Sequence, residues 1–300
     1  MKTRTLTLIF ALLTSTSFVF GQSSYAFKVL ANKGSNEVKS GDTWTPLKTG
    51  ASLRETDEVK LSDNAYIGLV HATGKPMELK QAGSYKISEL AKKVGGGSSV
   101  LNKYTDFILS SNSAEAKKNR LSATGAVHRA TETAAIKLLL PENQHSGIYN
   151  TVAVVNWEGS KVAGPYVVTV RNMFDEEITK FDTPETSFQI DLADPKFAAE
   201  NAVLVEVSSK SDARLASKQH LIKKLTPADQ EKVKKSLNEF NGELQEETAL
   251  NKLLLASFYE ENNLLIDAIT AYEGAVKLAP DVPTYKEAYD EFLLRHALKR

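Results

Sequence analysis

The sequence predicts a multidomain fold with an all-β N-terminal module, a β-sandwich middle domain and an α-helical C-terminal region. Between residues 27 and 90, short alternating segments are separated by glycines at the intervals expected of an all-β module. Between residues 133 and 208, roughly six or seven longer strands recur with no helical stretch between them, which favours a sandwich. After Thr226, apolar residues follow the spacing of helices.

This pattern divides the 300 residues into five segments. Three of them are folded domains, in agreement with about two or three domains for a chain of this length. The expected segments are a signal peptide (1–21), a β module (22–92), a hinge with an amphipathic helix and a linker (93–132), a β-sandwich (133–212) and a helical domain (213–300).

The N-terminus has the features of a signal peptide. Lys2 and Arg4 form the positive n-region, an apolar h-region follows, and Val19-Phe20-Gly21 fits a cleavage site. We expect cleavage after Gly21; cleavage after Ala26 and retention as an anchor helix are the alternatives. No other stretch reaches the ~18 apolar residues that a membrane span needs. The mature chain is therefore expected to be exported without membrane insertion, to the periplasm, the envelope or the outside of a cell.

The charge balance and the absence of cysteine exclude several classes of protein. The 37 basic and 37 acidic residues give a formal net charge of 0, so nothing favours nucleic acid or an anionic membrane as the main partner. The chain has no cysteine, which excludes disulfides, thiolate metal sites, thiol catalysis and a lipid-modified N-terminal cysteine. An exported chain without disulfides favours a bacterial envelope over a eukaryotic secretory route.

The first β module carries a series of glycine and apolar positions. The pattern V-x-S-G-D-x-W-x-P-L-x-x-G-x-x-L runs from Val38 to Leu53, and Asp57-Glu58-Val59, Ala65 to Leu69 and Gly74 to Leu79 follow it. This stretch resembles a FecR-like β domain. The resemblance implies an envelope sensing or scaffolding module with no active site. The family's usual transmembrane segment is missing, so a direct role in transmembrane signalling is not expected.

Between the two β modules the sequence changes character twice. Val94 to Ser99 reads VGGGSS and is expected to be a hinge, because it lacks the Gly-Lys-Ser/Thr end of a phosphate-binding loop. Val100 to Ser110 places its apolar residues on one helical face, which predicts a helix that packs on a neighbouring domain or on a partner. Ser111 to Thr131 is polar without an apolar period and is expected to be a linker.

The middle module combines a tryptophan with alternating strands. Trp157 ends one strand, Gly164-Pro165-Tyr166 opens the next, and a V-x-V-x-V strand at 203–207 closes the series. This arrangement resembles a fibronectin type III or immunoglobulin-like fold. Trp157 is expected in the core between two sheets, and stacking on a ligand is the alternative role.

The C-terminal region is predicted to be helical from Thr226 onward. Thr226 can cap a helix with Pro227 at its first position, and Asn241-Gly242 stops that helix. A last helix is predicted from Pro283. Its apolar face presents Tyr285, Ala288, Tyr289, Phe292 and Leu293.

Two further helices are predicted between Ala249 and Pro280, with small residues where the two helix axes would touch. The repeat-packing positions are Ala256, Ala268, Tyr272, Ala275 and Pro280, and Tyr259 stands three residues after Ala256. This spacing resembles a tetratricopeptide (TPR) repeat. The resemblance implies a helical hairpin that holds and displays rather than one that performs chemistry. A solenoid needs about three repeats to be stable, so these helices are expected to pack against the sandwich or against another chain.

These features predict a non-catalytic envelope scaffold that binds another protein through its TPR-like helices. The expected binding residues are Asn251, Leu255, Tyr259 and Asn262. The alternative is a carbohydrate- or cell-wall-binding protein whose aromatic side chains stack on sugar rings. Its candidate residues are Trp44, Tyr66 and Trp157. Exposure separates the two hypotheses, because stacking residues must be exposed.

No catalytic residue, cofactor or metal site is expected. The five histidines are scattered without a metal-binding spacing, and neither a G-x-S-x-G nor an H-E-x-x-H motif is present. Asp175-Glu176-Glu177 is expected to be a polar turn, with calcium binding as the alternative. Glu246-Glu247 and Glu260-Glu261 are expected to be exposed helix ends.

Overall fold

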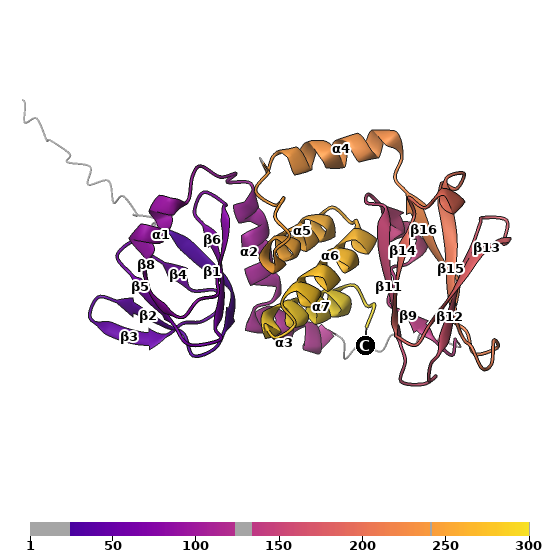
Figure 1. The fold of residues 1–300 in the computed structure, drawn as a ribbon, viewed down its shortest axis with the longest axis horizontal. Coiled ribbons are helices and arrows are strands. Elements are labelled where there is room, and N and C mark those ends of the chain that lie inside the picture. Colours follow the sequence, from indigo (N-terminus) through magenta and orange to yellow (C-terminus); the bar gives the residue numbers. More distant parts are fainter. Residues whose placement is uncertain (1–24, 124–133, 241, 300) are drawn as a thin grey trace, which may run out of the picture.

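The computed structural model describes residues 25–123, 134–240 and 242–299. In these residues, two β-rich parts lie at the two ends of the molecule and a layer of helices lies between them (Figure 1). β sheets in the N-terminal part and helices in the C-terminal region agree with the predicted multidomain layout. The predicted signal peptide, residues 1–21, lies outside the described residues.

The N-terminal part consists of two four-stranded antiparallel sheets. Their strand orders are β4-β1-β6-β7 and β3-β2-β5-β8. The strands are β1 (Phe27–Lys33), β2 (Glu37–Ser40), β3 (Thr43–Pro46), β4 (Ser52–Leu53), β5 (Glu58–Leu61), β6 (Tyr66–His71), β7 (Pro76–Leu79) and β8 (Gly83–Lys86). A short helix, α1 (Ile87–Lys93), follows β8. Helix α1 differs from the all-β module that the sequence predicts for residues 22–92.

Strand β6 separates two apolar cores. Side chains alternate between the two faces of a strand, so Ile67 and Leu69 point into the core of the N-terminal part. Tyr66 and Val70, on the opposite face of β6, belong to the core that the helices share. All four side chains are buried. This strand therefore connects the N-terminal sheets to the helical layer.

The middle part contains a five-stranded sheet, ordered β10-β16-β15-β12-β13, and a three-stranded sheet, ordered β14-β11-β9. The pairs are antiparallel except β10 with β16, which is parallel. The strands are β9 (Lys137–Leu138), β10 (Gly147–Ile148), β11 (Val152–Glu158), β12 (Tyr166–Arg171), β13 (Glu177–Thr183), β14 (Ser187–Asp191), β15 (Ala202–Ser209) and β16 (His220–Lys224). Single 3₁₀ turns are formed by η1 (Asn143–His145) and η2 (Pro195–Phe197).

The five-stranded sheet extends past residue 212, where the sequence predicts the helical domain to begin. Strand β16 pairs with β15 in the register Val203 to Ile222, and Ile222 is fully buried. The strand has the sequence HLIKK with one buried residue, so its alternation is too short to be recognised in the sequence. The helices of the C-terminal region begin only after Lys224.

Six helices form or border the central layer. They are α2 (Leu101–Ser111), α3 (Ala114–Ala123), α4 (Pro227–Asn238), α5 (Ala249–Glu261), α6 (Leu265–Leu278) and α7 (Pro283–Arg295). The predicted helix at 100–110 is confirmed as α2, and the hydroxyl of Thr226 caps α4 as predicted. None of the helices in the described ranges has the length and apolar character needed to cross a membrane.

Helix α3 occupies part of the segment that the sequence predicts to be a linker. Its sequence lacks an apolar stripe, but alanine, glutamate and lysine favour helix in their own right. The hydroxyl of Ser113 accepts a hydrogen bond from the Ala116 N–H at 3.1 Å, which satisfies one N–H of the first turn. The rest of the predicted linker, from residue 124, lies outside the described residues.

The helices share one continuous apolar core with the middle part of the chain. Helix α6 packs against β10 and β11, α2 and α7 pack against β1, and α5 packs against β7. Helix α4 runs along one side of this layer, from β16 back towards α5 (Figure 1). The C-terminal helices are therefore the centre of the molecule and not a separate tail.

Candidate functional site

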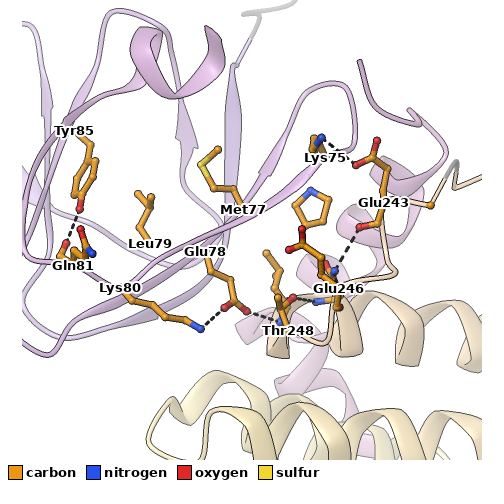
Figure 2. Close-up of a pocket in the computed structure, with 14 residues that line it drawn as sticks. Lys75, Met77, Glu78, Leu79, Lys80, Gln81, Tyr85, Glu243, Glu246 and Thr248 are labelled. Carbon is orange, nitrogen blue, oxygen red and sulfur yellow. Dashed lines mark hydrogen bonds and ion pairs between the residues drawn. The ribbon is translucent and has the colours of Figure 1, made fainter. Parts of the chain in front are cut away.

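A groove of about 600 Å³ opens between the N-terminal part and the helical layer (Figure 2). Residues 75–81 of β7 and its flanking turns form one wall, and the loop Gly242–Thr248 with the start of α5 forms the other. Figure 2 shows the side chains of Met77 and Glu78 on the first wall, and Glu243 and Glu246 on the second.

The β7 wall is fixed by the turn that precedes it. Gly74 has a φ of +92°, and a Cβ atom at this position would lie 1.9 Å from the carbonyl oxygen of Ser98. Only glycine can occupy such a position. The hydroxyl of Ser98 donates a hydrogen bond to the carbonyl of Glu239 at 2.5 Å. The predicted hinge at 94–99 therefore lies pinned between the β6–β7 turn and the end of α4.

The opposite wall is shaped by the first turn of α5. The hydroxyl of Thr248 accepts a hydrogen bond from the Asn251 N–H at 3.1 Å and caps the helix. The side-chain amide of Asn251 donates to the carbonyl of Glu246 at 3.0 Å. Asn251 is buried, so it holds the loop in place from within.

Glu78 links the two walls directly. Its Oε1 accepts a hydrogen bond from the backbone N–H of Leu250 at 3.0 Å, and its Oε2 lies 2.7 Å from Nζ of Lys80. Burial alone would raise the pKa of Glu78, but hydrogen bonds from Lys80, Tyr66 and Leu250 hold it below its usual value. Glu78 is therefore a carboxylate at neutral pH, and the groove has one fixed negative charge between its walls.

The remaining charges of the groove are distributed by wall. Lys75 and Lys80 lie on the β7 side, whereas Glu243 and Glu246 lie on the loop side. The Lys75 ammonium and the Glu243 carboxylate approach to 3.7 Å. Between the charges the lining is apolar, with contributions that include Met77, Leu79 and Leu250. Such a surface offers contacts to the side chains and to the peptide groups of an extended segment.

The four residues predicted to bind a partner do not share one open face. Asn251 borders the groove but is buried. Tyr259 is buried too, and its hydroxyl accepts a hydrogen bond from the side-chain amide of Asn150 at 3.0 Å. Leu255 is partly buried against the central core. Asn262 is exposed at the C-terminal end of α5.

The predicted repeat-packing residues lie mostly inside the helical layer. Those that are buried are Ala256, Ala268, Tyr272 and Ala275. Tyr272 stacks on Tyr289 of α7, with ring centroids 5.8 Å apart. Pro280 is exposed just beyond the end of α6. The small residues thus allow the close packing of α5 along α6.

A buried carboxylate of α6 joins the helical layer to the middle part of the chain. Asp267 accepts hydrogen bonds from the backbone N–H groups of Tyr149 and Asn150, both at 2.8 Å, and from the side-chain amide of Asn150 at 2.7 Å. Burial raises the pKa of Asp267 to about 6, although these hydrogen bonds act in the opposite direction. The sequence analysis did not single out this residue.

Glu260 corrects the expectation that Glu260-Glu261 is an exposed helix end. The side chain of Glu260 is 4% exposed and accepts hydrogen bonds from Arg295 at 2.8 and 2.9 Å. The Tyr272 hydroxyl donates to it at 2.9 Å. Burial alone would raise the pKa of Glu260, but His296 and Arg295 hold it below its usual value. This ion pair ties α5 to α7.

The three aromatic residues of the carbohydrate hypothesis differ in exposure. Tyr66 and Trp157 are 4% and 3% exposed, so neither ring can stack on a sugar. Trp44 is 37% exposed on strand β3. Asp175-Glu176-Glu177 lies at the β12–β13 turn. Among the side chains that the structure describes, no group of three or more His, Cys, Asp or Glu is placed to hold a metal ion.

The fold and the groove are thus defined by the residues of this chain alone. A scan against family models and a search of curated proteins found no match to this chain.

Proposed function

We propose that this chain is an exported, non-catalytic scaffold of the bacterial cell envelope that binds a segment of another protein in the groove beside β7. The observation that carries the proposal is the groove of about 600 Å³. Its lining is apolar between Lys75, Lys80 and Glu78 on one wall and Glu243 and Glu246 on the other. The two walls come from distant parts of the chain. The contact between Glu78 and Leu250 holds them at a fixed separation.

In this proposal the TPR-like hairpin α5–α6 is a structural support inside the molecule and does not itself bind the partner. Helix α5 packs against β7 on one side and α6 packs against β11 on the other, so β strands of this chain cover the faces that a TPR array would offer to a ligand. The FecR-like module supplies the strand wall of the groove, and the fibronectin-like sandwich supports the far side of the helices. The partner therefore binds beside the helical hairpin rather than within it.

An extended segment fits the groove better than a compact domain. β7 is an edge strand of its sheet and pairs with β6, so its outer backbone groups face the groove side. Charged side chains on opposite walls favour a segment that carries both an acidic and a basic residue around an apolar one. Lys75 is the basic contact of the β7 wall and Glu246 the acidic contact of the loop wall.

The proposal is tested by photocrosslinking in the cells that produce the protein. Benzoylphenylalanine replaces Met77 in the groove or, as the matched control, the exposed Lys60 of β5. We expect the groove position to crosslink to one defined segment of one protein, located by mass spectrometry. A synthetic peptide of that segment should then bind the purified full chain, measured by fluorescence anisotropy.

Two groove variants check that the peptide occupies this site. Met77→Arg places a charge in the apolar lining of the groove. Glu246→Lys reverses a charge on the loop wall. Each variant should weaken peptide binding by about tenfold or more. Lys60→Glu should leave the affinity unchanged. If Met77 and Lys60 positions crosslink alike, or if the groove variants bind as tightly as the wild type, the proposal fails.

The second candidate function, binding to cell-wall carbohydrate, now depends on Trp44 because its ring is the one with substantial exposure among the three candidates. If Trp44 stacks on sugar, Trp44→Ala should abolish sedimentation of the chain with purified cell-wall material. Unchanged sedimentation, or none by the wild type, removes this function.

A further inference from the structure

The β12–β13 hairpin presents two apolar side chains to solvent at its tip. Phe174 is 86% exposed and the adjacent Met173 is 53% exposed. Single exposed apolar residues are ordinary on protein surfaces. Phe174 differs because an almost fully exposed phenyl ring stands next to a second large apolar side chain.

The tip is held in one conformation by its own hydrogen bonds. The Asn172 side-chain oxygen accepts from the N–H groups of Phe174 and Glu176, at 2.9 and 3.0 Å. The Asn172 side-chain amide donates to the Glu176 carboxylate at 2.8 Å, and its backbone N–H donates to the Glu176 carbonyl at 2.9 Å. Asp175 adopts a φ of +64°, which aspartate tolerates better than most residues.

Neighbouring segments brace the tip from the side. The side-chain amide of Gln219 donates to the Asp175 carboxylate at 2.9 Å, and Arg171 approaches the same carboxylate to 3.6 Å. Because these bonds hold the backbone of the tip, binding costs little backbone freedom, and the loss is confined to the rotamers of Phe174 and Met173. The hairpin is thus preorganised to project Phe174.

The charges around the tip indicate which kind of surface the tip would contact. Asp175 lies beside Arg171, and Glu177 pairs with Lys180 at 2.5 Å. The exposed Glu176 has a neutral amide, Asn172, as its hydrogen-bond partner, so its charge is not compensated there. An acidic residue next to the apolar pair disfavours insertion into an anionic lipid surface. Charged residues along the edge strand β13 also oppose pairing with a second copy of the chain.

We infer that Phe174 and Met173 form an anchor that inserts into an apolar pocket of a partner protein, with lysine or arginine at the pocket rim facing Glu176. This contact goes beyond the groove, because it lies on the five-stranded sheet and uses none of the groove residues. The molecule would then hold a partner at each of two separate surfaces, which is the arrangement expected of an adaptor.

The inference is tested in the full-length chain with benzoylphenylalanine at position 174 and, as the matched control, at the exposed Glu185 of the β13–β14 turn. We expect crosslinking from position 174 to one protein, at a segment that contains apolar residues and a lysine or arginine. For that purified protein, Phe174→Ser should weaken binding at least about tenfold, as removal of an aromatic anchor does. Glu176→Lys should weaken binding and reduce its dependence on salt.

Leu278→Ser, at an exposed apolar residue of α6, should leave the affinity unchanged. Met77→Arg in the groove should leave crosslinking from position 174 unchanged, so the failure of one proposal is distinguishable from the failure of the other. The inference is overturned if positions 174 and 185 crosslink alike, or if Phe174→Ser binds the identified protein as tightly as the wild type. Phe174-dependent sedimentation with phosphatidylglycerol vesicles would assign the tip to a lipid surface. Phe174-dependent dimerisation in sedimentation velocity would assign it to a second copy.

Discussion

The hydroxyl groups of Tyr66 and Tyr285 lie 2.5 Å apart and form a buried hydrogen bond between strand β6 and helix α7. The two rings meet edge to face, with centroids 5.9 Å apart. Burial raises the pKa of both phenols, so both hydroxyls are protonated at neutral pH and one donates to the other. This contact joins the first β module to the last helix of the described chain.

Tyr66→Phe or Tyr285→Phe should therefore destabilise the protein by about 1–3 kcal/mol. Tyr66→Phe leaves the buried Tyr285 hydroxyl without its partner and also removes the hydrogen bond to Glu78, whereas Tyr285→Phe leaves the Tyr66 hydroxyl with Glu78 alone. The double substitution should cost less than the sum, since both single substitutions break the same Tyr66–Tyr285 hydrogen bond. Urea unfolding of the four proteins measures this coupling. Tyr85→Phe, whose hydroxyl bonds to the Gln81 carbonyl in an exposed position, is the control and should stay within about 0.5 kcal/mol. Additive losses would contradict the coupling.

The second prediction concerns pH and Asp267. Its pKa is about 6 in the folded chain and 3.8 for an ordinary aspartate, so the folded state binds this proton more tightly than the unfolded state. The contribution of Asp267 to the free energy of unfolding is therefore most favourable at low pH and falls as pH rises between 3.8 and about 6. Above about pH 7 it should be constant.

Asp267→Asn isolates this effect, because all other carboxyl groups titrate in both proteins. The stability of the wild type relative to the variant should fall by up to about 1.4 kcal/mol per pH unit across that window. Urea unfolding at a series of pH values measures the difference. A difference that rises with pH would show that the N–H groups of Tyr149 and Asn150 outweigh the effect of burial.

The third prediction compares a buried ion pair with an exposed one. Arg295→Met leaves the Glu260 carboxylate buried without its main cation and should destabilise the protein by about 3–5 kcal/mol. Lys286→Met removes an exposed partner of Asp290 and should cost no more than about 1 kcal/mol. Chemical unfolding measures both. Adding Glu260→Gln to Arg295→Met should restore part of the loss; no recovery would mean that packing of the arginine, rather than its charge, is responsible.

The sequence predicts best the elements whose apolar period is long. All five residues proposed for the apolar face of the last helix are buried in α7. Helix α3 and strand β16 were not predicted, because one has no apolar stripe and the other buries a single residue. An apolar period in a sequence reflects which side chains are buried. Elements that bury few side chains therefore have no apolar period by which to recognise them.

The groove could not be predicted because its walls come from residues 75–81 and 242–251, far apart in the chain. The Leu250 N–H bonds to Glu78, and Lys75 approaches Glu243. Contacts of this kind leave no pattern in a sequence. Asp267 did leave one: a charge inside the apolar run from Leu264 to Ile269 indicates a buried, hydrogen-bonded carboxylate. Glu260 lies among other polar residues at a helix end, so its burial had no comparable signal.

The last prediction separates two effects of glycine at the turns of the N-terminal part. Gly74 and Gly41 both have positive φ values, +92° and +67°, but a Cβ atom would clash with the Ser98 carbonyl at position 74 and would meet nothing within 4 Å at position 41. Gly41→Ala should therefore cost about 1–2 kcal/mol, the strain of a left-handed conformation alone. Gly74→Ala should cost more, because the β6–β7 turn must also move away from Ser98. That movement would pull the Glu78 carboxylate away from the Leu250 N–H. A peptide that binds the groove should therefore bind the Gly74→Ala chain more weakly. It should bind the Gly41→Ala chain as tightly as the wild type. Equal stability losses in the two variants would show that the turn yields without disturbing the groove.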